Sequence, residues 1–233
     1  MPRVQNPSIG SGASALLEQT VALTSAQILA LTTTTITLVA APGAGKVIIP
    51  LQIASVFTFG TLPYLSADGG SLGIQYAGGT YQNINGSVPG VIGALADTLY
   101  YSAAFLNTPQ AILPGADNVA MTIKANLSIA SGPIVTTTLG AGGLGYAVND
   151  TGTILVQSGD ATYKVLTVGA GGAVLTYQIT GAGTSYDVQN AAATMTGGAQ
   201  PGVGVGFTVN ITAVNHGDGT LKVTTYYQVL AVP

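Results

Sequence analysis

In the stretch LKVTTYYQVLA, residues 221–231, mostly apolar side chains alternate with mostly polar ones. Successive side chains of a strand point to opposite faces of a sheet, so this pattern predicts a strand with one buried face. The residues expected to face inward are Leu221, Val223, Thr225, Tyr227 and Val229. Similar alternation occurs in GFTVNITA (206–213) and in VAMTIKANL (119–127), where Thr122 and Lys124 are expected on the solvent side.

Turn sequences rich in Gly, Asn and Asp separate these stretches, as in SADGG (66–70) and NHGDG (215–219). Many short strands joined by such turns are typical of a β-sandwich or barrel. The helical signal is short, with Ser25 expected as the N-cap of AQILAL (26–31). The predicted fold class is therefore all-β: a sandwich- or barrel-like core domain with an inserted, small, Gly-rich antiparallel β domain.

The composition changes near Pro133. The following region is dense in glycine and contains a weak repeat, because LGAGG (139–143) returns as VGAGG (168–172). The closing segment instead resembles the first region in its tyrosines and its alternation. We therefore predict an extended N-terminal arm, a discontinuous β core and an inserted domain, with these bounds: arm 1–22, core 23–133 plus 215–233, and insertion 134–214.

Charged residues are scarce: five Lys/Arg and eight Asp/Glu in 233 residues, for a net charge of -3. Small soluble domains commonly carry charges on about 25–35% of their surface residues. The composition therefore predicts that much of the surface contacts other subunits. The few cations disfavour nucleic-acid binding. Prolines interrupt the most apolar stretch, residues 35–57, so neither a transmembrane helix nor a membrane partner is expected.

The motifs that could carry chemistry are incomplete. APGAGKV (41–47) resembles a phosphate-binding loop, but Ala40 replaces its opening glycine and Val47 its hydroxyl residue, which favours a glycine turn between strands. His216 is the only histidine, and the chain has no cysteine. We therefore expect no enzyme activity, no cofactor and no metal site. The alternative is a polysaccharide-degrading enzyme, or a calcium-binding loop, that uses Asp150, Asp160 or Asp187.

Eleven tyrosines and no tryptophan are the other notable feature of the composition. Tyrosine provides a large contact area at low entropic cost, which suits subunit interfaces, although strand propensity alone also enriches it. With the few charged groups of the arm and the glycine turn, the candidate interface residues are Arg3, Glu18, Lys46, Tyr64, Tyr100, Tyr101, Tyr226 and Tyr227.

Two segments resemble a family of tailed-bacteriophage virion proteins: LTSAQILALTTTTITLVAAPGAGKVIIPL (23–51) and GDGTLKVTTYYQVL (217–230). GYAVNDTGTI (145–154), GTSYDV (183–188) and TMTGGAQPGVGVGFTVNITAV (194–214) are similar to small β repeats of phage tail-fibre and head-decoration proteins. The resemblance implies a symmetric homo-oligomer, expected to be a trimer, on the outer surface of the capsid or on the tail. Its expected partners are the major capsid protein or other virion proteins, and it implies no catalytic residues.

The expected function is that of a capsid decoration, or cement, protein. Its core would bind neighbouring capsid subunits, and its insertion would project outward. In the alternative, a tail-fibre or adsorption component, the insertion would bind a host surface glycan through exposed aromatic rings. The tyrosines expected in that role are Tyr146, Tyr163, Tyr177 and Tyr186.

Overall fold

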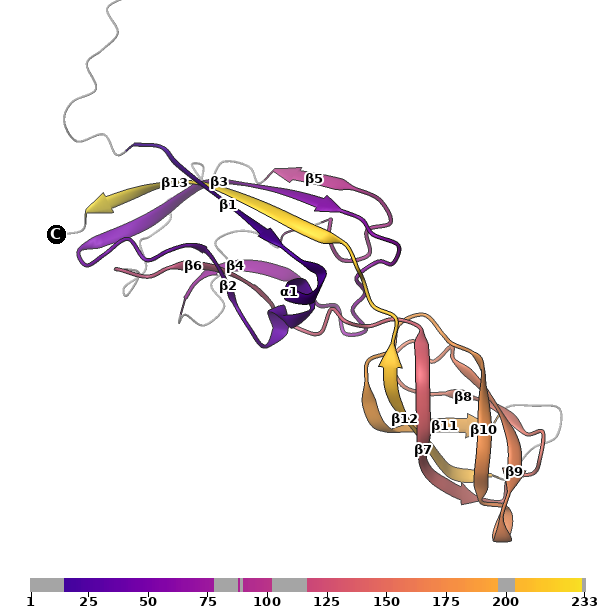
Figure 1. Cartoon of the computed structure of the whole chain (residues 1–233). Helices are drawn as coiled ribbons and strands as arrows, with labels where there is room; N and C mark the ends of the chain where they lie inside the picture. Colours follow the sequence, from indigo (N-terminus) through magenta and orange to yellow (C-terminus); the bar gives the residue numbers. More distant parts are fainter. Residues whose placement is uncertain (1–14, 78–87, 89, 102–116, 197–203, 232–233) are drawn as a thin grey trace, which may run out of the picture.

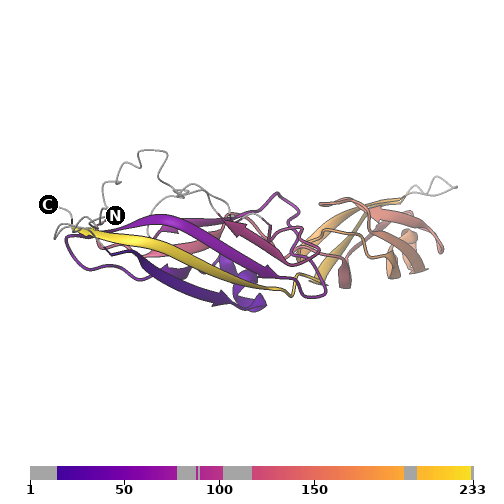
Figure 2. The ribbon, with the colours of Figure 1, turned by 90° about the horizontal axis from the view of Figure 1, so that it is seen from above.

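The computed structural model describes residues 15–77, 88, 90–101, 117–196 and 204–231 (Figure 1). These residues form antiparallel sheets with a single short α-helix, which confirms the predicted all-β fold class. The strands separate into two groups, and the second group extends from one end of the first (Figure 2). None of the helices in the described part of the chain is long and apolar enough to cross a membrane.

The first group is a sandwich of two sheets. The larger sheet has the order β1-β13-β3-β5, with these bounds: β1 Leu17–Leu23, β13 Thr220–Ala231, β3 Lys46–Thr58 and β5 Thr98–Tyr101. The smaller sheet has the order β2-β6-β4, with bounds Ile36–Val39, Met121–Ala125 and Leu72–Tyr76. Residues from both sheets form one hydrophobic core, which includes Phe57, Ile74, Ile123 and Val223.

The predicted arm is too long at its C-terminal end. Residues 17–22 lie in β1, which pairs residue by residue with β13, and Leu23 is buried. Only the end of β1 reaches the core, so the sequence LEQTVAL needs no strict alternation of apolar and polar residues. Without that alternation, the sequence does not indicate a strand here. Arg3 and the rest of residues 1–14 lie outside the described residues.

A short helix connects β1 to β2. It comprises α1 (Ser25–Leu29) and the 3-10 turn η1 (Ala30–Thr32), and Ile28 and Leu31 are completely buried. The N-cap is Thr24 rather than the predicted Ser25. Thr24 Oγ1 accepts a hydrogen bond from the Gln27 backbone N–H, and Gln27 Oε1 accepts one from the Thr24 backbone N–H. This capping box requires a Gln or Glu three residues after the cap, a spacing that Thr24 satisfies.

Burial confirms the alternation of β13 only as far as Thr225, since Leu221, Val223 and Thr225 are buried. Tyr227 and Val229, also predicted to face inward, are only half-buried, because an irregularity shifts the register between Tyr226 and Tyr227.

The expectation for residues 119–127 is partly wrong, since Thr122 is buried as well. β6 is the central strand of its sheet, between β2 and β4, and the Thr122 hydroxyl lies 3.4 Å from the Gln75 carbonyl oxygen. A central strand can bury residues on both faces, which alternation in the sequence does not reveal.

The second group is a six-stranded sheet of order β10-β9-β8-β11-β12-β7. β10 also lies against β7, so the sheet is a nearly closed barrel. Phe207 is at the centre of a separate core and meets three tyrosine rings edge-on, at centroid distances of 5.0 to 5.8 Å. The bounds are β7 Ile134–Leu144, β8 Thr151–Ile154, β9 Thr162–Val168, η3 Ala170–Gly172, β10 Val174–Gly181, β11 Gln189–Thr196 and β12 Val205–Val214.

The two groups are joined by two adjacent stretches of chain. The first leaves the core at Gly132, and the second returns at Asn215, whose N–H donates to the Pro133 carbonyl oxygen at 2.9 Å. A Cβ on Gly132 would lie 1.5 Å from the Asn215 carbonyl oxygen, so only glycine permits this close approach. β7 to β12 thus lie together between residues 134 and 214, and β13 returns to the larger core sheet.

Candidate functional site

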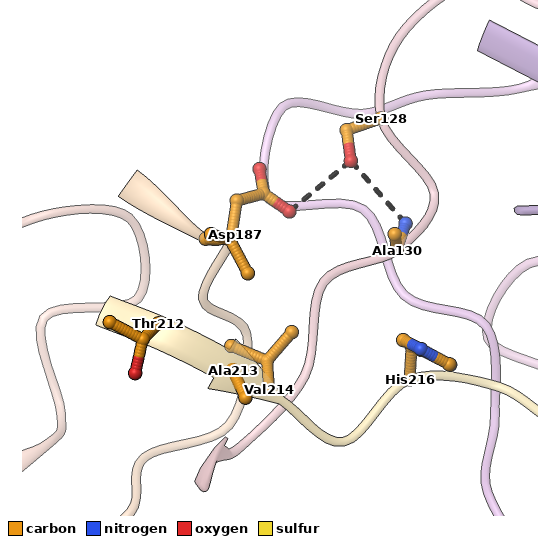
Figure 3. A pocket seen from close by; sticks show the side chains of 8 residues that line it. Ser128, Ala130, Asp187, Thr212, Ala213, Val214 and His216 are labelled. Carbon is orange, nitrogen blue, oxygen red and sulfur yellow. Dashed lines mark hydrogen bonds between the residues drawn. The ribbon is translucent and has the colours of Figure 1, made fainter. Parts of the chain in front are cut away.

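A pocket of about 370 Å³ lies where the two β domains meet (Figure 3). The loop before the insertion contributes one wall, and the loop after Tyr186 and the end of β12 contribute the others. The lining residues are Ser128, Ala130, Asp187, Val188, Thr212, Ala213, Val214 and His216.

Asp187 fixes the two domains to each other at the edge of this pocket. Its carboxylate accepts hydrogen bonds from Ser128 Oγ at 3.2 Å, Ser131 Oγ at 2.7 Å and Gln157 Nε2 at 3.2 Å. Next to it, Gly132 and Tyr186 exchange two backbone hydrogen bonds of 2.9 Å. Asp187, one of the three carboxylates of the enzyme alternative, therefore has a structural role at the junction. The serines are 56 and 59 residues away in sequence, so no local pattern could predict the contact.

His216 lies on another wall of the pocket and is an exposed residue. Its ring nitrogen Nδ1 lies 3.4 Å from the carbonyl oxygen of the adjacent Gly217. Figure 3 shows no hydrogen bond between His216 and Asp187. Within the described residues, no group of three or more His, Cys, Asp or Glu side chains could hold a metal ion.

The remaining candidate carboxylates stabilise loops. Asp150 accepts from the Ala147 N–H, and Asp160 accepts from the hydroxyls of Ser158 and Thr184. The hydrogen bond from Ser158 is the main reason that the pKa of Asp160 lies below its ordinary value. A general acid needs a raised pKa instead. Asp160 is therefore not suited to be the general acid of the enzyme alternative.

The glycan alternative needs exposed aromatic rings in the insertion. Tyr146, Tyr163 and Tyr186 are buried, and Tyr177 packs against the same core and donates a hydrogen bond to Thr137 Oγ1. The expectation that these rings bind sugars is therefore wrong. They fill the barrel because its Gly-rich strands supply few other large side chains.

The glycine turn at residues 41–47 connects β2 to β3, as predicted. Gly43 and Gly45 have positive φ angles of 98° and 69°, which glycine adopts without strain. Side chains already occupy the N–H groups that a phosphate would need: Asn118 Oδ1 accepts from Gly43, and Asp117 Oδ1 accepts from Lys46. Lys46 is exposed at the first position of β3.

The larger core sheet has one face turned away from the core, which we term the outer sheet face. Glu18 and Tyr226 are direct cross-strand neighbours on it, and Tyr101 is opposite Ala54 on the same face. The structure thus brings together three of the predicted interface residues. Strand register and alternating burial place these residues on the outer sheet face: Glu18, Thr20, Ala22, Gln52, Ala54, Val56, Leu99, Tyr101, Lys222, Thr224 and Tyr226.

Three other predicted interface residues point elsewhere. Tyr64 is completely buried and donates a hydrogen bond to the Gly219 carbonyl oxygen at 2.7 Å, so it is a core residue rather than a surface contact. Its burial raises the pKa to about 12. Tyr227 packs partly against the core, and Tyr100 is opposite the buried Ser55. Tyrosine is amphipathic, so its occurrence in the sequence does not distinguish these environments.

The outer sheet face has an apolar part that no local pattern in the sequence indicates. Val56 and Leu99 are cross-strand neighbours and are 41% and 58% exposed, and Tyr101 beside them is 57% exposed. Among the described residues of this face, Glu18 and Lys222 are the only charged ones. An exposed apolar cluster of this kind on a sheet is typical of an interaction surface.

No protein-family model, curated protein or solved structure matches this chain.

Proposed function

We propose that this chain is a virion structural protein of a tailed bacteriophage, namely a capsid decoration protein that binds the assembled shell as a homo-oligomer and carries out no catalysis. The outer sheet face is the observation that carries the proposal. It presents exposed Val56, Leu99 and Tyr101 beside only two charged groups. Of the segments that resemble phage virion proteins, 217–230 contributes most of β13, and 23–51 contributes only the first residues of β3, 46–51. β13 and β3 are the two central strands of this sheet.

The mechanism is mechanical. A protein that binds the assembled shell but not its separated subunits stabilises the shell by mass action, by an amount that grows with its concentration relative to the dissociation constant. Apolar contact area drives such binding, and a face with few charges loses little hydration when it is covered. The insertion extends from one end of the core (Figure 2), so it can project while the outer sheet face is occupied.

Labelled antibodies on virions of the phage that encodes the chain provide the direct test. We expect label over the whole capsid shell in electron micrographs. Label confined to the tail would overturn the decoration role, and virions without label would overturn the virion role altogether.

A pair of variants tests the surface. We expect Leu99→Lys to weaken co-sedimentation with capsids by about tenfold, because it places a charge within the apolar contact. Leu95→Lys is the matched control, since Leu95 is 75% exposed but precedes β5 and lies outside the sheet. Equal loss in the two variants would contradict the assignment of the outer sheet face.

A further inference from the structure

β1 is an edge strand of the larger core sheet and, among the described residues, is open on its outer side along its whole length. It is the first strand in the order β1-β13-β3-β5, so it has a strand partner on one side only. It has 7 residues, whereas the other edge strands of the core, β5, β2 and β4, have 4, 4 and 5. In the insertion the first and last strands of the sheet lie against each other. β1 is therefore an edge on which another strand could add.

This edge lacks the usual protection against strand addition. Natural proteins protect edges with proline, lysine, bulges or short strands. Residues 17–23 contain neither proline nor lysine, and their register with β13 has no irregularity. Glu18 is the only charged residue, and most side chains of β1 are exposed. The outer N–H and C=O groups of β1 can thus accept a new antiparallel strand.

We propose that β1 pairs with β1 of a second copy, antiparallel, around a two-fold axis through Thr20. The two four-stranded sheets then join into one continuous sheet. In this register Leu17 is opposite the partner's Leu23, Glu18 is opposite the partner's Ala22, and Thr20 meets the partner's Thr20. The inference rests on the proposed function in that it identifies a contact between copies in the assembly, and it makes that assembly a two-fold dimer instead of the trimer that the resemblance implies.

The charges on the outer sheet face favour a second copy as the occupant of this edge. Ala22 is directly opposite Lys222 within one chain, so Glu18, the partner's Ala22 and the partner's Lys222 lie in one row. Two strand spacings separate the charged residues by about 10 Å at Cβ, and the small alanine between them lets the long side chains meet. Neither Glu18 nor Lys222 makes an ion pair within the described structure. The two-fold axis forms this pair twice.

Thr20 suits the position on the axis. Its hydroxyl already pairs with that of Thr224 across the strands, at 2.9 Å. Cross-strand threonine pairs of the same kind join Thr136 to Thr212, Thr162 to Thr180 and Thr167 to Thr176. Such pairs stabilise neighbouring strands, and they require no charge.

Analytical ultracentrifugation of the purified full chain over a range of concentrations tests the pairing. We expect a monomer–dimer equilibrium that Thr20→Lys weakens by at least about tenfold, because the two new lysines oppose each other across the axis. Thr224→Lys is the matched control. It loses the same hydroxyl pair and lies on the same face, but one strand away from the edge, so it should retain the dimer.

A charge exchange provides the second test. We expect Glu18→Lys to weaken the dimer and the added Lys222→Glu change to restore it, because the pair is then reversed rather than broken.

A monomer at every concentration, a trimer, or association that Thr20→Lys leaves intact would overturn the inference, as would equal loss in both threonine variants. A monomeric chain that still binds capsids would overturn the pairing alone. A dimer sensitive to Thr20→Lys that is absent from virions would overturn the proposed function alone.

Discussion

Thr225 faces the sandwich core from β13, between Val223 and the partly buried Tyr227. Its Oγ1 is the one buried side-chain oxygen or nitrogen, among the described residues, without a hydrogen-bond partner. A buried polar atom without a partner costs about 1–3 kcal/mol of desolvation. Valine has nearly the same shape and no hydroxyl.

We therefore expect Thr225→Val to raise the free energy of unfolding by about 1 kcal/mol in urea denaturation. Thr37→Val is the control, because Thr37 is an exposed residue of β2 whose hydroxyl makes no hydrogen bond in the described structure, and it should change stability by less than about 0.5 kcal/mol. A clear loss of stability in Thr225→Val would mean that the hydroxyl has a partner after all.

The Asp218 carboxylate, in the loop before β13, accepts hydrogen bonds from two neighbouring residues of another loop. The Leu62 N–H, at 2.9 Å, and the hydroxyl and N–H of Thr61, at 2.7 and 2.8 Å, all donate to its carboxylate. These hydrogen bonds, with that from Leu62 as the largest cause, hold the pKa of Asp218 below its ordinary value of 3.8. Because the pKa is lower in the folded state, the ionised group stabilises the fold above about pH 4, and this is lost as the pH falls through the folded-state pKa.

The expected result is that Asp218→Asn lowers stability at neutral pH and that its difference from the wild type shrinks as the pH falls from 5 to 2. Thermal unfolding at a series of pH values measures this. Asp68→Asn is the control, since the Asp68 carboxylate accepts no hydrogen bond in the described structure. A difference that stays constant with pH would show that Asp218 does not act through its charge.

At the scale of elements, the short helix depends on its N-terminal cap. α1 has only 5 residues, too few for helix propensity alone to maintain it. Thr24→Ala removes the capping box and should destabilise the protein by about 1 kcal/mol. Thr35→Ala is a suitable control, because Thr35 is exposed beyond η1 and its hydroxyl makes no hydrogen bond in the described structure. Equal effects of the two variants in urea denaturation would contradict the role of Thr24.

The strands differ in how far the sequence predicts them. β12 and β13 were predicted from alternation because each buries one face, with Phe207, Val209 and Ile211 inward in β12. β1 was assigned to an arm because its strand character depends on pairing with β13, 204 residues away, rather than on its own pattern. The contacts of Asp187 could not be predicted from the sequence for the same reason, because Ser128 and Ser131 reach its carboxylate only after both domains have formed.

At the scale of the whole molecule, the small number of charged residues is reflected in the side-chain hydrogen bonds that connect strands and loops. In the described structure, pairs of threonine hydroxyls connect exposed strands, and carboxylates such as Asp160 and Asp218 stabilise loops by accepting hydrogen bonds. The composition alone shows that the chain has few charged residues. It does not show that the outer sheet face is where this matters, because that face combines residues from four strands. Composition predicts that a protein has partners, and strand register then determines which residues can meet them.

The insertion should be separable from the core. Each has its own hydrophobic cluster, and the chain ends that flank residues 134–214 are already hydrogen-bonded through Asn215 and Pro133 at 2.9 Å. We expect a chain in which an Asn-Gly linker replaces residues 134–214 to fold cooperatively. It should be about 1–3 kcal/mol less stable than the core within the full chain, because Ser128 and Ser131 lose the Asp187 carboxylate.

The isolated fragment of residues 134–214 should fold as well, since its sheet closes on itself and buries the rings around Phe207. Urea denaturation of the two pieces and of the full chain measures this. The slope of unfolding free energy against urea scales with the surface exposed, so the slopes of the two pieces should add to about the total slope for the full chain. A fragment without a cooperative transition would mean that the core domain supports the barrel. The insertion could then not project from the core as an independent unit.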